Sequence, residues 1–414
     1  MPLIRPFPGL RPAPGCAAEV LAPPYDVLNT TEARARAADR PWSFLHISKP
    51  EIDLPAGIDP YSPAVYSKAQ ENFARQINEG VLVRDPQPYY YLYRLIMGTH
   101  VQTGLVAAAH VADYDSNRIR KHEFTRPDKE DDRVRQIDAL NAQTGPVFLT
   151  YRHSDVIDSL SVAVAASVPD VDVRADDGVQ HSLWVIRDPD KIDTITCHFD
   201  SMKYLYIADG HHRSAAASRV AAARRTANPA HQGDEPYNYF LSVLFPDNQM
   251  QILDYNRVVK DLHGRSAEQF LAEVAESFNI EAERQPVKPQ RAREFGMYLK
   301  SGWYRLRLDK KFVPENDPVK RLDVSLLQDN LLSPILGIGD PRRDKRVDFV
   351  GGIRGLKELQ QRVDSGEMAC AFAIYPTSMA DLMRVADAGE VMPPKSTWFE
   401  PKLADGLVSH VLAP

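Results

Sequence analysis

The chain has 414 residues, 43% of them hydrophobic, and its 50 basic and 56 acidic residues leave a net charge of −6. This near balance argues against a general nucleic-acid-binding or membrane-surface protein, and no apolar run is long enough to predict a transmembrane helix. Three cysteines spread far apart, Cys16, Cys197 and Cys370, indicate neither a disulfide framework nor a CxxC metal site. We therefore expect a cytoplasmic protein without a signal peptide.

The first half of the chain predicts helices followed by strands. TEARARAADRP (31–41) and PAVYSKAQENFARQINEG (63–80) are typical of helices, the second ending at Gly80. YYYLYRLIMGTHVQTGLVAAAHV (89–111) reads as a hairpin with a Gly-Thr-His turn. PVFLTYRH (146–153) and HSLWVIRD (181–188) predict further strands.

The second half alternates between the two kinds of element. FLSVLFPDNQMQILDYNRVV (240–259) predicts a hairpin with its turn at Pro246 to Asn248. SAEQFLAEVAESF (266–278) has helical spacing, and residues 346–387 read as strand, helix, strand, helix. This mixture predicts an α/β or mixed α+β fold. Tentative subdomain boundaries follow from the composition, giving residues 1–175, 176–265 and 266–414 within one unit of 1–414.

The sequence ADGHHR (208–213) lies between an apolar strand and an alanine-rich helix. Gly210 at this junction permits close approach of a ligand, and the helix N-terminus that follows is a favourable anion site. Arg213 can bind phosphate oxygens bidentately, and His211 and His212 can donate hydrogen bonds or accept protons. Asp209 is a candidate for contact with Mg²⁺ or for activating a hydroxyl. A plainer interpretation is that Asp209 caps the helix, Arg213 pairs with it and the histidines pack.

Three further clusters could bind anions or take part in catalysis. KHEFTRPDKEDDR (121–133) follows a predicted strand, where active-site groups often lie, although a solvated loop and helix start would explain it too. MPPKSTWFEPKL (392–403) offers Lys395, Ser396 and Thr397 for phosphate but lacks the glycines of a P-loop. GIGDPRRDKRVDFVGGIRG (337–355) combines glycines with five basic residues: Arg342, Arg343, Lys345, Arg346 and Arg354.

These segments together resemble a bacterial and archaeal family called domain of unknown function 1015 (DUF1015). The resemblance rests on APPYDV (22–27), KHEFTRPDKEDDR, IADGHHRSAAA, YNRVVKDL (255–262), LQDNLLSPILGIGDPRRDKRVDFVGGIRG and MPPKSTWFEPKL, in that order. Ser214 departs from the pattern, because an aromatic residue is expected to follow the arginine.

The DGHHR element also resembles the nucleotide-phosphate motif of ParB and sulfiredoxin-like proteins, which include free serine kinases. That resemblance implies a nucleotide-binding core of this fold with additional mixed-sheet subdomains. It implies a small-molecule kinase that phosphorylates free L-serine to O-phosphoserine with ATP or ADP and Mg²⁺. The alternative is a non-catalytic nucleotide-binding regulatory protein.

The expected roles of the residues follow from these motifs and resemblances. We expect no membrane or nucleic-acid partner, and a homodimer is left open. The catalytic candidates are Asp209, Glu123 and His211, with Asp209 also the candidate metal ligand. The nucleotide or phosphate candidates are Gly210, His212, Arg213, Lys395, Ser396 and Thr397. Further candidate substrate or phosphate contacts are His122, Arg126, Lys129, Arg133 and Arg346.

Overall fold

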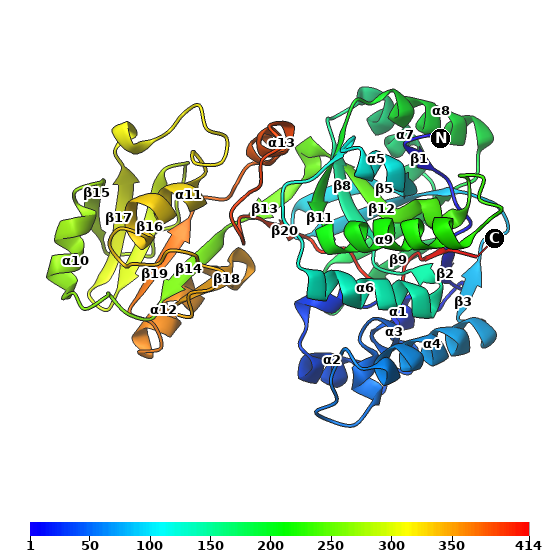
Figure 1. Cartoon of the computed structure of the whole chain (residues 1–414), viewed down its shortest axis with the longest axis horizontal. Helices are drawn as coiled ribbons and strands as arrows, with labels where there is room; N and C mark the ends of the chain where they lie inside the picture. Colours follow the sequence, from blue (N-terminus) through cyan, green and yellow to red (C-terminus); the bar gives the residue numbers. More distant parts are fainter. Residues whose placement is uncertain (414) are drawn as a thin grey trace. The chain divides into compact units, whose positions relative to one another are not determined.

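The computed structural model describes residues 1–413 and has the expected mixed α/β fold. The chain divides into two compact units (Figure 1). Unit 1 contains residues 1–250 and 401–414, and unit 2 contains residues 251–400. The three tentative subdomains remain a prediction. The proposed boundary at residue 175 falls in the turn between two paired strands, β9 (Val171–Arg174) and β10 (Gln180–Ile186).

Unit 1 is built on a nine-stranded mixed sheet. Its order is β6-β11-β8-β12-β5-β4-β10-β9, with β1 paired to β5. The remaining strands of this sheet are β1 (Ile4–Arg5), β4 (Tyr90–Met97), β5 (His100–His110), β6 (Ile119–Arg120), β8 (Val147–Tyr151), β11 (Leu205–Asp209) and β12 (Tyr239–Pro246). Strand β11 runs parallel to β6 and antiparallel to β8. The predicted hairpin at 89–111 is confirmed as β4 and β5.

Helices cover one face of this sheet. Alternate residues of the strands, such as Val147, Leu149 and Tyr151 of β8, form a continuous apolar core with side chains of α6 (Pro127–Leu140) and of four further helices. These helices are α5 (Val111–Asp115), α7 (Asp155–Ala165), α8 (Pro189–Ser201) and α9 (His211–Ala227). On the opposite face, the Tyr91 hydroxyl accepts a hydrogen bond from the Gly9 amide and the Tyr93 hydroxyl accepts one from the Ala404 amide. The two ends of unit 1 therefore cover the face that these helices leave.

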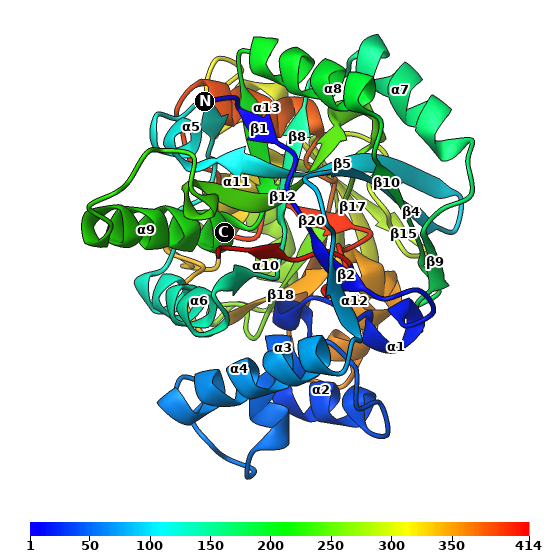
Figure 2. The ribbon, with the colours of Figure 1, turned by 90° about the vertical axis from the view of Figure 1, so that its right-hand side faces the viewer.

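A second apolar cluster joins the small N-terminal helices to the end of α6 and to three short strands outside the main sheet. Helix α6 (Pro127–Leu140) lies beside α9 (Figures 1 and 2), and Arg219 of α9 pairs with Glu130 and Asp131 of α6. The N-terminal helices are α1 (Ala17–Val20), α2 (Thr30–Ala37), α3 (Leu45–Ser48) and α4 (Pro63–Asn78). Two short ribbons complete the unit, β2 (Leu10–Pro12) with β3 (Leu82–Arg84) and β7 (Ala142–Gln143) with β21 (His410–Val411).

Unit 2 is an antiparallel sheet of six strands in the order β15-β17-β16-β19-β14-β18. The strands are β14 (Tyr255–Val259), β15 (Phe278–Glu283), β16 (Glu294–Leu299), β17 (Gly302–Leu308), β18 (Val347–Gly351) and β19 (Cys370–Ile374). The helices are α10 (Ala267–Val274), α11 (Asp323–Leu327), α12 (Gly355–Asp364) and α13 (Met379–Asp387). Strand β13 (Gln251–Leu253), where the chain enters the unit, pairs with β20 (Trp398–Glu400), where it leaves.

The hairpin predicted at 240–259 is wrong. Its first strand, β12, pairs with β5 and β8 inside unit 1, whereas the following strands β13 and β14 pair with strands of unit 2. The turn at Pro246 to Asn248 therefore leads from one unit toward the other. Adjacent apolar strands with turn residues between them look like a hairpin, but β12 is a fully buried central strand whose two edges are already occupied.

Candidate functional site

The candidate site begins at the junction between β11 and α9. Gly210 has φ of 100°, a left-handed conformation that a side chain would strain. A Cβ atom there would lie 3.2 Å from the Arg213 guanidinium carbon and 3.3 Å from the Cα of Val147. The register of β11 against β8 also shifts between Ile207 and Asp209. The sequence therefore brings the end of β11 and the first turn of α9 close against β8.

The Asp209 carboxylate lies between two cations. Its Oδ2 is 3.5 Å from the Lys402 Nζ and 3.6 Å from an Arg213 Nη. The Asp209 side chain keeps 36% of its surface exposed, so solvent reaches the carboxylate. Burial by itself raises the pKa of Asp209, but the charges of Lys402 and Arg213 outweigh it and hold this pKa well below its usual range. Asp209 is therefore ionised at neutral pH.

Arg213 is held in place by contacts on several sides. It donates a hydrogen bond to the Pro146 carbonyl, and its guanidinium lies 4.0 Å from the Asp26 carboxylate. Burial lowers the pKa of Arg213, but Asp209 and Asp26 together raise it above its usual value. Arg213 therefore remains a fixed positive charge next to Asp209.

The two histidines face the segment that carries Glu123. The Nε2 of His211 accepts a long hydrogen bond of 3.4 Å from the His122 amide, and their rings meet edge to face at 4.5 Å. Burial and the His122 ring hold the pKa of His211 well below its usual value, so the ring is neutral. Because Nε2 accepts, the single ring proton belongs on Nδ1, which lies 3.7 Å from the Glu123 carboxylate.

His212 contacts the same segment, residues 122–126, at its other end. Its Nε2 accepts a hydrogen bond of 3.1 Å from the Arg126 amide, and burial lowers its pKa. About two turns further along α9, the ion pairs from Arg219 to Glu130 and Asp131 tie α9 to α6. The histidines thus hold residues 122–126 against the start of α9, and this places the Glu123 carboxylate beside the His211 ring.

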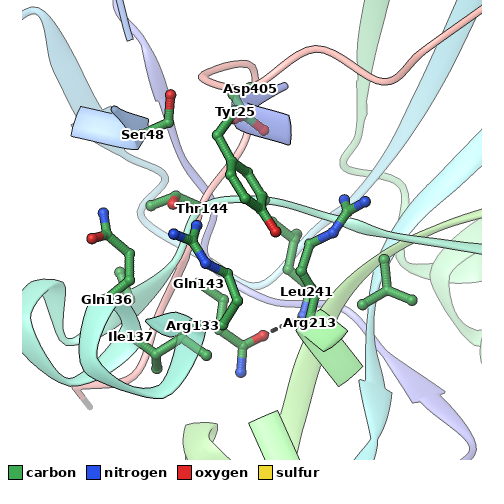
Figure 3. Close-up of a pocket in the computed structure, with 13 residues that line it drawn as sticks. Tyr25, Ser48, Arg133, Gln136, Ile137, Gln143, Thr144, Arg213, Leu241 and Asp405 are labelled. Atoms are coloured by element: carbon green, nitrogen blue, oxygen red, sulfur yellow. Dashed lines mark hydrogen bonds between the residues drawn. The ribbon is translucent and has the colours of Figure 1, made fainter. Parts of the chain in front are cut away.

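A cavity of about 30 Å³ lies beside Arg213. Figure 3 shows the Tyr25 ring between the side chains of Arg133 and Arg213, and the Arg133 guanidinium lies 3.9 Å from the centre of that ring. Asp405 also lines the cavity, and burial raises the pKa of this carboxyl to about 7 although Arg213 opposes the shift. This volume is sufficient for an ordered water molecule.

The structure brings together many of the residues singled out in the sequence. Gly210, His211 and Arg213 lie beside Asp209. His122 and Glu123 contact His211, Arg126 contacts His212, and Arg133 lines the cavity with Arg213. Lys129 points elsewhere, since its ammonium donates a hydrogen bond to the Tyr61 hydroxyl.

The remaining candidates belong to unit 2. Arg346 binds Asp344, Asp261 and the Leu336 and Gly337 carbonyls within that unit. The Ser396 hydroxyl donates to the Pro393 carbonyl, and its carbonyl accepts from Thr377. Lys395 has φ of 56° and lies near the Tyr255 ring. The proposed phosphate contacts of Lys395, Ser396 and Thr397 therefore remain a prediction.

Four residues of the site escaped the sequence-based assignment: Tyr25, Asp26, Lys402 and Asp405. Tyr25 and Asp26 lie in APPYDV, and Lys402 in MPPKSTWFEPKL, so the motifs contained the signal. Their proximity to Asp209 could not be predicted from the sequence, because these residues lie nearly two hundred positions before or after it in the chain.

Within residues 1–413, no three histidine, cysteine, aspartate or glutamate side chains are arranged to bind a metal ion. Asp209 alone would supply one carboxylate oxygen, and two cations already face it. A Mg²⁺ ion at this position would need most of its ligands from phosphate and water, which is how proteins commonly bind it. No helix in the described part of the chain has the length and apolar character needed to cross a bilayer.

A family model described as "Protein of unknown function (DUF1015)" matches residues 4–325. The chain belongs to the DUF1015 family. This match covers the continuous part of unit 1 and about half of unit 2, and it includes the DGHHR element and the segment 121–133. A search of curated protein sequences found no match to this DUF1015 protein.

Solved structures show distant likeness to this DUF1015 protein. One is a free serine kinase in complex with AMP, with 11% identity over 73% of this chain and 92% of the other and a TM-score of 0.35. Another is a conserved hypothetical protein from Pyrococcus furiosus, with 13% identity, 72% and 93% coverage and a TM-score of 0.33. A third is SbnI with a C-terminal truncation from Staphylococcus aureus, with 12% identity, 72% and 85% coverage and a TM-score of 0.39. TM-scores of this size are too low to say what this chain binds.

Proposed function

We propose that unit 1 binds a nucleotide and transfers its terminal phosphoryl group to the hydroxyl of a small molecule. One observation supports this above the others. An ionised, solvent-accessible carboxylate and two cations meet at the N-terminus of a seventeen-residue helix that no side chain caps. Phosphoryl transfer depends on placing charges around the phosphate and orienting the acceptor, and these groups can do both.

The phosphates would bind at the start of α9. The first amides of a helix carry a partial positive charge and point toward an incoming anion. Arg213 and Lys402 would add two full charges and would exchange part of their attraction to Asp209 for contacts with phosphate oxygens. Nucleotide binding would in this way release the Asp209 carboxylate for its own task.

Asp209 would orient the acceptor hydroxyl and accept its proton as the acceptor oxygen bonds to phosphorus. The bond from phosphorus to the bridging oxygen breaks at the same time, and the shortened nucleotide leaves with its charge. Glu123 is the second candidate for the proton, since its carboxylate lies 3.7 Å from the His211 ring at the start of α9. Mg²⁺, when bound with the nucleotide, would neutralise phosphate charge, with Asp209 as its candidate protein ligand.

Free L-serine is the acceptor that we propose first. This choice rests on the resemblance of Asp209, His211, His212 and Arg213 to the motif of free serine kinases. The donor is ATP or ADP, both of which present a terminal phosphate to the same groups.

The test is a phosphoryl-transfer assay with the purified chain, Mg²⁺, ATP or ADP, and a panel of hydroxylated amino acids, read by mass spectrometry. We expect O-phosphoserine from the wild-type chain. Asp209→Asn should lower turnover by about 10²- to 10⁴-fold, the usual contribution of an acid or base. The matched control is Asp190→Asn, which removes an equal charge from an exposed position of α8 and should leave turnover unchanged.

Two results would contradict the kinase proposal. Tight nucleotide binding with no product from any acceptor would favour the regulatory alternative, in which the same site senses nucleotide. Equal turnover in Asp209→Asn and Asp190→Asn would remove Asp209 from the mechanism.

A further inference from the structure

Unit 2 contains a buried arginine with no acidic partner. Arg257 lies in β14 and retains only 4% of its surface. Its cross-strand neighbours are Phe349 on β18 and Phe372 on β19, and its guanidinium carbon lies 5.0 Å from the centre of the Phe349 ring. Within residues 251–400, no carboxylate forms an ion pair with it. Buried charges in proteins are almost always paired, so this one calls for an explanation.

Backbone carbonyls provide the hydrogen bonds that Arg257 makes. One Nη donates to the Tyr255 carbonyl on its own strand, and the other donates to the Pro394 carbonyl at a long 3.3 Å. A guanidinium has five N–H donors, so these two contacts leave capacity for an anion. Burial lowers the pKa of Arg257 to about 10, which still leaves the group charged at neutral pH.

A second cation approaches the same place. Lys395 follows Pro394 directly, is exposed, and places its Nζ 5.5 Å from the centre of the Tyr255 ring. The turn that carries Lys395 is held by the Ser396 hydroxyl on the Pro393 carbonyl and by Thr377 on the Ser396 carbonyl. The Tyr255 carbonyl therefore accepts a hydrogen bond from Arg257, while the ammonium of Lys395 lies near the Tyr255 ring. The two positive side chains thus approach the same end of β14.

We propose that Arg257 and Lys395 form a second anion site, which binds a phosphate-type oxyanion on unit 2. A phosphate oxygen would replace the long contact from Arg257 to Pro394, and Lys395 would contact the anion from the solvent side. Phosphate suits this pair because a guanidinium binds it bidentately while an ammonium supplies a point charge. This proposal concerns residues of unit 2 alone, and it does not depend on whether unit 1 is a kinase.

The experiment uses the full chain with Arg213→Gln, which disables the proposed phosphate contact in unit 1. Inorganic phosphate, ADP and acetate are titrated by calorimetry into this background. We expect the Arg213→Gln chain to bind inorganic phosphate and not acetate. Adding Arg257→Met should weaken phosphate binding by at least about tenfold, because a charge-assisted bidentate contact is lost. Binding of ADP but not of inorganic phosphate would assign the site to a nucleotide and overturn its simple phosphate specificity.

The matched control in the same background is Arg307→Met, which removes an equal charge from a partly exposed, ion-paired position of the same sheet. It should leave phosphate affinity unchanged. A thermal melt gives an independent readout. Phosphate should raise the melting temperature of the Arg213→Gln chain, and Arg257→Met should abolish this shift while melting no earlier in phosphate-free buffer. If Arg257→Met melts earlier and phosphate shifts neither chain, Arg257 is purely structural and the proposal fails.

Discussion

Two aspartates of unit 1, Asp209 and Asp405, have pKa values that are shifted in opposite directions. Lys402 and Arg213 both lie within 4 Å of Asp209, and the pKa of Asp209 is depressed. Asp405 is almost completely buried, and burial raises its pKa to about 7. Direct ion pairs thus outweigh desolvation at Asp209, whereas at Asp405 the charges of Arg213 and Arg133, which form no ion pair with it within 4 Å, do not.

Removing the ammonium of Lys402 should raise the pKa of Asp209. We expect Lys402→Met to shift this pKa upward by about one unit or more, as loss of an opposite charge at this distance commonly does. Carboxyl-carbon NMR of the labelled chain measures it directly, and Lys203→Met, which removes a lysine outside the site, is the control. An unchanged Asp209 titration would show that Arg213 alone sets the charge.

Asp405 should make the stability of the protein depend on pH. Its pKa is raised in the folded state, so its contribution is fully present below the unfolded pKa of about 3.9 and is lost as pH rises toward about 7. This titration changes the free energy of unfolding by up to about 4 kcal/mol. Urea unfolding at pH 5 and pH 8 should therefore show a smaller loss of stability for Asp405→Asn than for the wild type. Equal losses in the two chains would mean that Asp405 does not titrate in this range.

At the scale of elements, the junction between β11 and α9 decides whether the site forms. Gly210→Ala should destabilise the protein by about 1–2 kcal/mol through its left-handed backbone, and the new methyl group should press on Arg213 and on β8. Gly178→Ala is the matched control, because Gly178 has φ of 86° but open space around it. We expect similar losses of backbone stability in urea and a loss of nucleotide affinity for Gly210→Ala alone. Equal affinities would show that the close packing at Gly210 does not shape the site.

Local elements could be predicted from the sequence because their signals are local. The structure contains the predicted elements: helices α2, α4 and α10, the hairpin of β4 and β5, and the glycine junction before α9. Pairing over long distances could not be predicted in this way. The hydrophobic pattern indicates that β12 is a buried strand, but it does not predict that β12 pairs with β5 and β8. The same limit explains the site, where the motif around Asp209 was recognised and the distant Lys402 and Tyr25 were not.

At the scale of the whole molecule, unit 2 is an insertion between two parts of unit 1. The chain enters through β13 and leaves through β20, and Gln251 lies opposite Glu400 in this ribbon. The two crossing points are therefore only one strand spacing apart. Sequence composition gave no sign of this arrangement, because domain boundaries at paired strands lack the Gly-, Pro- or Ser-rich character of a flexible linker.

This ribbon permits a direct test of the two units. Replacing residues 251–400 with a short Gly-Ser turn should leave unit 1 folded, because its core and both faces of its sheet come from residues outside the insertion. We expect a cooperative melt and retained nucleotide binding, together with loss of the phosphate binding attributed to Arg257. A shortened chain that lacks a cooperative transition would show that unit 1 needs unit 2 in order to fold.

The position of Lys402 along the chain has a consequence for protein synthesis. Asp209 and Arg213 leave the ribosome well before Lys402, and all of residues 251–400 must be made in between. A growing chain that stalls inside the insertion therefore has helix α9 but lacks one of the two cations beside Asp209. Fragments that end within the insertion would expose a carboxylate without its full counter-charge, so the site is complete only once the segment that carries Lys402 has been translated and has docked on unit 1.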